Sequence, residues 1–121
     1  MDEIELVEPD EIPQPPDRVT IESLAARVYP DGRRVRLDIR LTPFLERPNL
    51  ELTVVNAQGE PVASLSVIES MDYKLEMTAH LRGPQPVGRY IVRGELFYEE
   101  ESPRRIAEVS FDVPQPGPSR L

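Results

Sequence analysis

The chain has 121 residues, no cysteine, one histidine and a formal net charge of −8, a length that suits one domain. The lack of cysteine excludes disulfides, thiolate catalysis and cysteine-based zinc sites, and no apolar run approaches the roughly 18 residues of a membrane-spanning helix. The acidity is uneven, because residues 1–17 hold seven acids and no base while the other 104 residues hold 15 acids and 14 bases.

Residues 1–17 are predicted to form an acidic, proline-rich flexible arm. Its four prolines oppose a helix and favour an extended, solvated chain. Such a segment is typical of a solubilising leader, and a partner-binding tail is the alternative. The acidic start lacks the basic and apolar regions of a signal peptide, which indicates a cytoplasmic protein. A secreted form that had lost its signal peptide would have the same sequence features.

Residues 18–113 alternate apolar and polar side chains with a period of two, which predicts β-strands. Seven strands are expected, at residues 18–29, 33–42, 49–56, 61–69, 71–81, 87–98 and 104–113. In the first of them the apolar residues change parity near Ser23, which indicates a β-bulge or a strand that changes sheets midway. Pro61, near the start of the fourth, fits an edge strand because no backbone donor is needed there. Residues 114–121 are expected to form a flexible tail.

Each predicted strand has one apolar face, so two sheets must pack these faces against each other. The spacing of the strands is close to the interval of about 8–12 residues that is usual in sandwiches and barrels. The sequence therefore predicts an all-β, two-sheet antiparallel sandwich of about seven strands over residues 18–113. A closed barrel is the alternative, but the longer connections at 43–48 and 82–87 favour a Greek key.

A family resemblance supports this architecture. The stretch Gly88-Arg89-Tyr90, together with the later Val109-Ser110-Phe111-Asp112-Val113, resembles the last two strands of bacterial immunoglobulin-like and fibronectin type III-like domains. The resemblance implies an immunoglobulin-like sandwich in which Tyr90 forms a tyrosine corner, its hydroxyl bonded to backbone upstream. The chain lacks the cysteine pair and the tryptophan of antibody domains. Many functions share this superfamily, so the resemblance implies no activity.

The sequence offers no pattern for catalysis, a metal or a cofactor. His80 is the only histidine and is expected on an outward strand face, where alone it cannot build a zinc or copper site. No Gly-x-Ser-x-Gly elbow or glycine-rich phosphate loop occurs. Three acids at 99–101 are expected to be solvated at a loop tip, which favours neither general acid chemistry nor calcium binding. We therefore predict a protein that is not an enzyme and carries no cofactor or metal.

Arg34, Arg36 and Arg40 are predicted to share one outward strand face. This basic face could meet phosphates, an acidic partner or the acidic arm, and pairing with cross-strand acids such as Glu51 is the favoured interpretation. A near-neutral domain with few aromatic residues argues against nucleic acid as a partner.

A second candidate surface follows from the inward orientation expected of Tyr90. Strict alternation then places Ile91, Arg93 and Phe97 on the outside of the same strand. With Ile106 on the next strand they would form an exposed apolar patch, the usual mark of a contact surface. The alternative is that the N-terminal arm folds back and covers this patch.

The sequence therefore favours a non-enzymatic protein-interaction or accessory module. Its expected partner is another protein or a second copy of the chain, with no nucleic acid and no membrane. The alternative is a small ligand- or carbohydrate-binding sandwich with its site in loops 43–48, 83–87 and 99–103. The lack of tryptophan argues against stacking on sugars, so a small-molecule ligand is the less favoured partner.

Overall fold

The computed structural model describes residues 12–83 and 86–115. Its elements are the short 3₁₀ turn η2 (Pro16–Arg18) and seven strands, β1 (Ile21–Val28), β2 (Arg34–Leu41), β3 (Asn49–Val55), β4 (Pro61–Val67), β5 (Lys74–His80), β6 (Gly88–Phe97) and β7 (Arg105–Val113). Within these residues no helix has the length and apolar character needed to cross a membrane.

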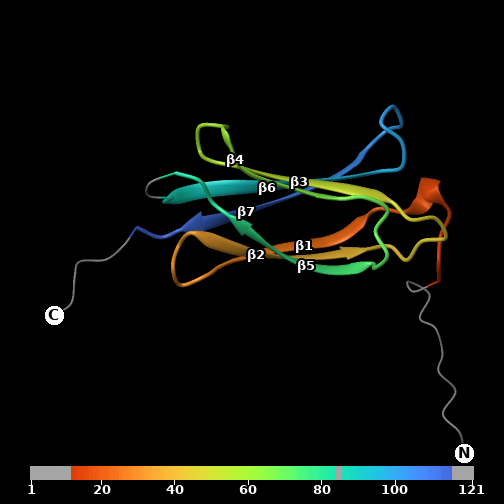
Figure 1. Cartoon of the computed structure of the whole chain (residues 1–121), viewed down its shortest axis with the longest axis horizontal. Coiled ribbons are helices and arrows are strands. Elements are labelled where there is room, and N and C mark those ends of the chain that lie inside the picture. The colour runs from red at the N-terminus through yellow and green to blue at the C-terminus, as the bar shows by residue number, and fades with distance from the viewer. Residues whose placement is uncertain (1–11, 84–85, 116–121) are drawn as a thin grey trace, which may run out of the picture.

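The strands form two antiparallel sheets, with the orders β1-β2-β5 and β4-β3-β6-β7. The sheets lie one above the other as two layers (Figure 1). This arrangement confirms the predicted two-sheet sandwich. β4 is hydrogen-bonded to β3, whereas in the constant type of immunoglobulin domain the fourth strand belongs to the sheet of the first, second and fifth.

Local features of the strands follow the sequence pattern. The β1–β2 register shifts between Ile21 and Ser23, so the predicted bulge is confirmed. Pro61 starts β4, which is an edge strand as expected. The inward residues of β2 are at most 3% exposed because β2 is the central strand of its sheet: Val35, Leu37, Ile39 and Leu41.

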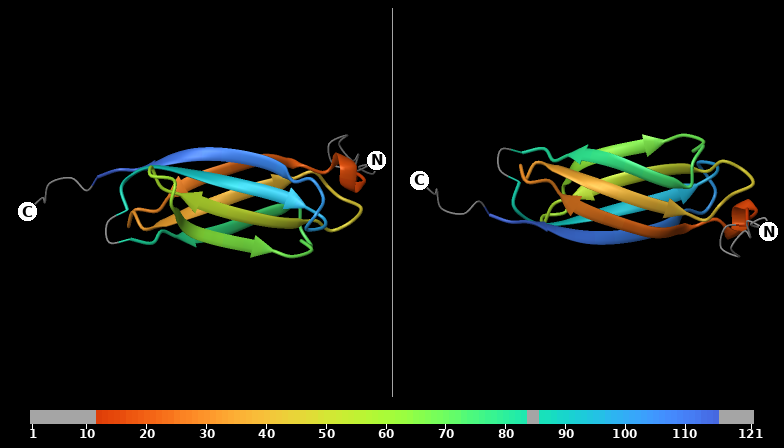
Figure 2. Two further views of the ribbon diagram at one scale, coloured as in Figure 1. Left: turned by 90° about the horizontal axis from the view of Figure 1, so that it is seen from above. Right: turned by 90° about the horizontal axis from the view of Figure 1, so that it is seen from below.

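The connections between strands gather at two opposite ends of the sandwich (Figures 1 and 2). The β2–β3, β4–β5 and β6–β7 connections lie at the end where the described chain begins, which we call the loop end. The β1–β2, β3–β4 and β5–β6 connections lie at the other end. Of the three loops expected to form one ligand site, 43–48 and 99–103 lie at the loop end. Loop 83–87, whose residues 84 and 85 are outside the described residues, belongs to the opposite end, so that three-loop site is wrong.

Gly94 lets the two sheets approach closely. It faces inward from β6, and a Cβ atom there would lie 3.1 Å from Ile21 Cδ1 and 3.1 Å from Leu52 Cδ2. Ile21 belongs to the opposite sheet, so a larger residue at position 94 would have to push the sheets apart or displace both side chains.

We predict that Gly94→Val lowers the free energy of unfolding by about 1–3 kcal/mol, because it overpacks the contact of β6 with Ile21 of the opposite sheet. Urea denaturation should show a lower midpoint with an unchanged slope. Ser110→Val, on the exposed face of β7, is the matched control and should change stability by at most about 0.5 kcal/mol. Equal stability of Gly94→Val and the wild type would contradict this account of the packing.

Candidate functional site

The outer face of β6 and β7 does not form the continuous apolar patch expected from the sequence. Ile91 is 37% exposed and Ile106 is 50% exposed. Ile106 lies opposite Glu95, however, four residues along the strand from Ile91, or about 13 Å. Arg93 lies between them and its guanidinium is 3.2 Å from the carboxylate of Glu108. The two isoleucines are therefore separate apolar side chains on a charged face.

Phe97 has the outward parity that alternation predicts, but it is only 5% exposed. The guanidinium carbon of Arg104 lies 3.8 Å from the centroid of its ring. Arg104 is held there by ion pairs with three acids, Glu51, Glu95 and Glu100. The prediction that Phe97 is exposed is therefore wrong, because a charged side chain from the following loop folds back over it. The alternative was that the N-terminal arm covers this face, and most of that arm, residues 1–11, lies outside the described residues.

The arginines of β2 lie on the outer face of the three-stranded sheet, and each has an acidic partner. The pairs are Arg34–Asp31 at 2.7 Å, Arg36–Asp38 and Arg36–Glu76 at 3.1 Å, and Arg40–Glu22 at 3.5 Å. The expectation that these arginines pair with neighbouring acids is thus confirmed, although the acids are not the one named from the sequence. Glu51 is not among these partners because it belongs to the other sheet. Interleaved acids reduce the positive charge of this face.

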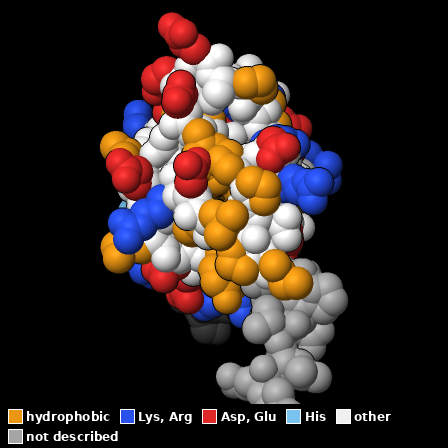
Figure 3. All heavy atoms as spheres, turned by 90° about the vertical axis from the view of Figure 1, so that its right-hand side faces the viewer, with side chains coloured by type: hydrophobic (Ala, Val, Ile, Leu, Met, Phe, Trp, Pro, Cys, Tyr) orange, Lys and Arg blue, Asp and Glu red, His pale blue; other side chains and the backbone are white. Residues whose placement is uncertain are grey.

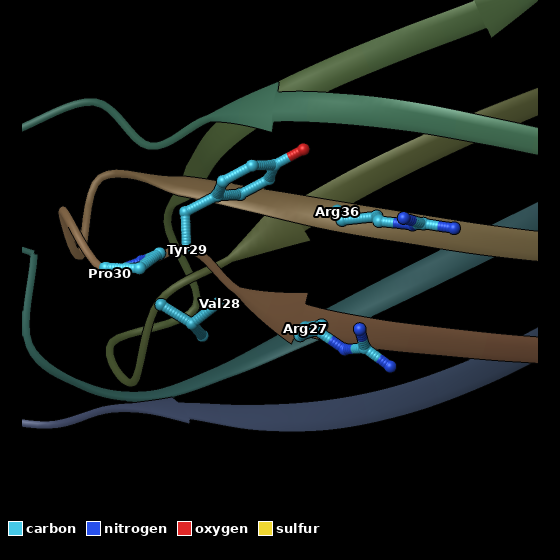
Figure 4. A pocket seen from close by; sticks show the side chains of 5 residues that line it. All are labelled: Arg27, Val28, Tyr29, Pro30 and Arg36. Atoms are coloured by element: carbon cyan, nitrogen blue, oxygen red, sulfur yellow. The ribbon is translucent and has the colours of Figure 1, made fainter.

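A shallow hollow of about 160 Å³ lies at one end of the same face. Figure 4 shows Arg27 on β1 and Arg36 on β2 extending in the same direction, with Tyr29 beyond the end of β1. The guanidinium of Arg34 stacks 4.4 Å from the centre of the Tyr29 ring. Ligand pockets usually measure about 300–1,000 Å³, so this hollow is too small for most organic ligands.

Two further residues singled out by the sequence occupy the positions expected. His80 is exposed on β5, and the described residues contain no group of three metal-ligating side chains. Tyr90 is 4% exposed, and its ring stacks on that of Phe111 at 5.3 Å between centroids. Burial raises the pKa of Tyr90, and a hydrogen bond with the backbone of Val87 partly offsets this shift. The tyrosine-corner role of Tyr90 stays a prediction, with Val87 as its upstream partner.

The most prominent exposed apolar surface lies at the loop end. Four large side chains from three segments are exposed there: Ile12 (49%), Leu45 (67%), Ile68 (78%) and Met71 (74%). We call this set the loop-end surface. Figure 3 shows hydrophobic side chains running across this end, with charged groups along its borders. Solvated loops normally expose polar residues, so these four side chains need an explanation.

The segment that carries Ile12 is fixed to the β2–β3 loop by backbone hydrogen bonds. The Gln14 N–H donates to the carbonyl of Pro43, and the Leu45 N–H donates to the carbonyl of Gln14, both at 2.9 Å. These two bonds form a short parallel bridge between Gln14 and Phe44. Ile12 and Leu45 are therefore carried by segments that lie side by side.

Asn49, at the start of β3, ties the other two loops together. Its Oδ1 accepts from the Glu69 N–H at 2.8 Å, and its Nδ2 donates to the Tyr98 carbonyl at 3.1 Å. The Tyr98 hydroxyl in turn donates to the carbonyl of Glu46 at 3.0 Å. One chain of side-chain hydrogen bonds thus joins the β2–β3, β4–β5 and β6–β7 connections.

The turn between Ile68 and Met71 is fixed from inside. Ser70 is only 2% exposed. Its N–H donates to the carbonyl of Pro48 at 2.8 Å, and its hydroxyl donates to the carbonyl of Asp72 at 2.6 Å. Glu69 has a positive φ of 50°, an unusual conformation for a residue with a side chain. This turn holds Ile68 and Met71 outward on either side of the buried serine.

Sequence reasoning missed this surface. The strand expected at 71–81 starts with Met71 on its apolar face, which would point inward, but β5 begins only at Lys74. The expectation for Met71 is wrong because the Ser70 turn interrupts the strand before the alternation resumes. One usable signal was present: Ile68 has the opposite parity to Leu65 and Val67, whose parity is the inward one.

Comparisons with known proteins identify the fold and no family. No protein-family model matches the chain, and no curated protein matches it. A member of glycosyl hydrolase family 2 from Bacteroides cellulosilyticus is similar in structure, with a TM-score of 0.56 and 16% identity over 78% of this chain. A Bifidobacterium dentium β-glucuronidase complexed with coumarin-3-O-glucuronide has a TM-score of 0.53 and 15% identity, also over 78%. The match spans 15% and 17% of those chains, and at this identity it shows the fold alone.

We predict that Asn49→Ala loosens the loop end, because it leaves the Glu69 N–H and the Tyr98 carbonyl without their partner. The free energy of unfolding should fall by about 1–3 kcal/mol, and amide exchange at Glu69 should accelerate. Asn56→Ala is the matched control, since Asn56 accepts two backbone N–H groups at the opposite end. Slow exchange at Glu69 in Asn49→Ala would contradict the proposed role of Asn49.

We also predict a late tyrosine ionisation. Burial, and secondarily the charge of Glu46, raise the pKa of Tyr98 to about 12. The folded state holds this proton more tightly than the unfolded chain, whose tyrosines ionise near pH 10. The stability due to Tyr98 is therefore complete below about pH 10 and is lost as the pH rises from 10 to 12. Spectrophotometric titration should show a late component that shrinks in Tyr98→Phe, and an unchanged titration in that variant would refute the assignment.

Proposed function

We propose that this chain is a non-catalytic accessory module that binds another protein through the loop-end surface. The observation that carries the proposal is the exposure of Ile12, Leu45, Ile68 and Met71, between 49% and 78%, at one end of the fold. Contact of such apolar side chains with water is unfavourable, and the free energy falls when another surface covers them.

The way these side chains are held also supports binding. The hydrogen bonds of Gln14, Asn49 and Ser70 fix the loops before any partner arrives. A partner therefore has less loop entropy to overcome than it would with mobile loops. Exposed charged residues of both signs border the apolar centre: Glu46, Arg47, Glu69 and Asp72. An apolar centre with a polar rim is the usual composition of a protein–protein interface.

The structural neighbours are compatible with an accessory role. In the glycosyl hydrolase family 2 protein and in the β-glucuronidase, the matching fold is a small part of a much larger chain. A sandwich of this size can therefore serve within or beside a larger protein. The loop end also corresponds to the end of an immunoglobulin variable domain that carries its binding loops.

The second candidate function is carbohydrate binding at the same end, and the likeness to glycosyl hydrolases favours it. Sugar sites usually contain aromatic rings on which a sugar can stack. The loop-end surface is aliphatic, and the chain has no tryptophan. Shifts of loop-end amide resonances with a panel of neutral and acidic oligosaccharides would favour this second function over protein binding.

The proposal is tested by cross-linked affinity capture from the source organism with the full chain as bait. Leu45→Asp and Met71→Asp each place a charge on the loop-end surface at a highly exposed position, so they should not disturb the fold. We expect each variant to lose a protein that the wild type captures, with binding of the purified pair at least tenfold weaker.

Ile91→Asp and Ile106→Asp are the matched controls, because they place the same charge at exposed isoleucines of the β6–β7 face. They should retain the captured protein. Loss of binding in these two variants but not in the loop-end variants would move the interface to the sheet face. Phe97→Asp cannot serve as such a variant, because it would bury a carboxylate beneath Arg104.

A further inference from the structure

The edge strand β4 differs from the other three sheet edges in its lack of charge. Native edge strands are usually protected from pairing by charged residues, prolines or bulges. Each of the other edges carries charge: Glu22 and Arg27 on β1, Lys74 and Glu76 on β5, and Arg105, Glu108 and Asp112 on β7. β4 has the sequence PVASLSV and no charged residue.

Only the first half of β4 has protective features. Pro61 supplies no backbone donor, and a register shift follows between the partners of Val54 and Val55. The carbonyl of Val62 accepts a hydrogen bond from the N–H of Arg82 at 3.2 Å, on the side away from β3. From Ala63 to Val67 the register with β3 is regular, and the strand order gives β4 no second neighbour among the described residues.

The open backbone groups of this half can be assigned to two serines. An antiparallel strand turns its N–H and C=O groups alternately to its two sides. The Asn56 N–H donates to the carbonyl of Glu60 across the β3–β4 turn, so the even-numbered residues of β3 turn their backbone groups toward β4. Leu50 and Leu52 are paired with Val67 and Leu65 in the register, and the alternate residues Ser64 and Ser66 therefore turn their backbone groups away from β3. Each serine therefore presents one backbone donor and one backbone acceptor that a strand added beside β4 could bond.

The side chains next to the β4 edge determine which residue types an added strand needs. On this side of the sandwich Leu65 and Val67 of β4, and Leu75 and Met77 of β5, are only partly buried. On the opposite side β1 and β7 lie against each other. A strand added at β4 needs apolar residues of inward parity to cover the partly buried side chains. It needs small polar residues of outward parity beside Ser64 and Ser66, which are both exposed.

β4 itself meets these requirements. Its inward residues are apolar, its outward residues are Ser64 and Ser66, and it brings no charge against its own copy. We propose that two copies of this chain associate through antiparallel pairing of β4 with β4. Centred on Leu65, this pairing sets Ser64 of each copy opposite Ser66 of the other and satisfies the outward backbone groups of all four serines. The contact is isologous and closed, as in two-fold dimers, and joins two four-stranded sheets into one.

The test uses the full chain and sedimentation equilibrium over a wide range of protein concentration. We expect the mean mass to rise from 13.8 kDa toward twice that value, because so short a strand contact gives a weak dimer. Ser66→Pro removes an outward N–H donor and leaves the hydrogen bonds between β4 and β3 in place. It should abolish the rise of the mean mass with concentration. Ser66→Thr keeps that donor and is the matched control, which should still dimerise.

A second measurement does not depend on any variant. Hydrogen exchange of the Ser64 and Ser66 amides should slow as the wild-type concentration is raised, while exchange at the exposed β7 edge stays constant. A monomer at every concentration would overturn the proposal, as would a dimer that persists in Ser66→Pro. Loss of the dimer in Met71→Asp but not in Ser66→Pro would show that the loop end is the self-contact. Capture of a different protein through the loop end does not depend on whether β4 pairs with β4, so the two proposals can fail separately.

Discussion

Two apolar sheet faces must cover each other in this molecule, since no helix among the described residues covers either one. The strict alternation of β2 and β3 follows from that requirement, because every second residue enters the shared core. The requirement also explains Gly94, an inward position of β6 without a side chain, where Ile21 and Leu52 fill the space instead. Charge is thereby confined to the outer faces, where acids and arginines pair across neighbouring strands.

The ends of a sandwich create a different problem, because loops leave backbone groups without sheet partners. At the loop end a few side chains solve it: Asn49 and Ser70 bond the backbone of neighbouring loops, and Tyr98 bonds the carbonyl of Glu46. Loops fixed by hydrogen bonds do not need their own apolar side chains for packing. Leu45, Ile68 and Met71 are therefore free to face the solvent, and their exposure is compatible with a well-ordered structure.

The sequence predicted the fold well because period-two alternation is a local signal. All seven strands, the β1 bulge and the edge position of Pro61 could be inferred from it. The surfaces were harder to predict, because exposure depends on what a distant residue covers. Alternation gives Phe97 the correct face, yet only the path of the β6–β7 loop brings Arg104 over its ring. Met71 likewise depends on Ser70, whose buried turn has no marker in the apolar pattern.

Charge distinguishes the two surfaces that we propose for contacts, the loop end and the second half of β4, from the outer sheet faces. Elsewhere, the outer faces carry paired acids and arginines, and an incoming protein would have to break or desolvate these pairs. At the loop end and along Ala63–Val67 it would meet apolar side chains and small serines instead. The two surfaces also differ in kind. The loop end presents apolar side chains to the surface of another protein. The β4 edge presents backbone groups that any strand with a suitable side-chain pattern could bond. Under the two proposals, a partner binds at the end of the domain while a second copy pairs along its side.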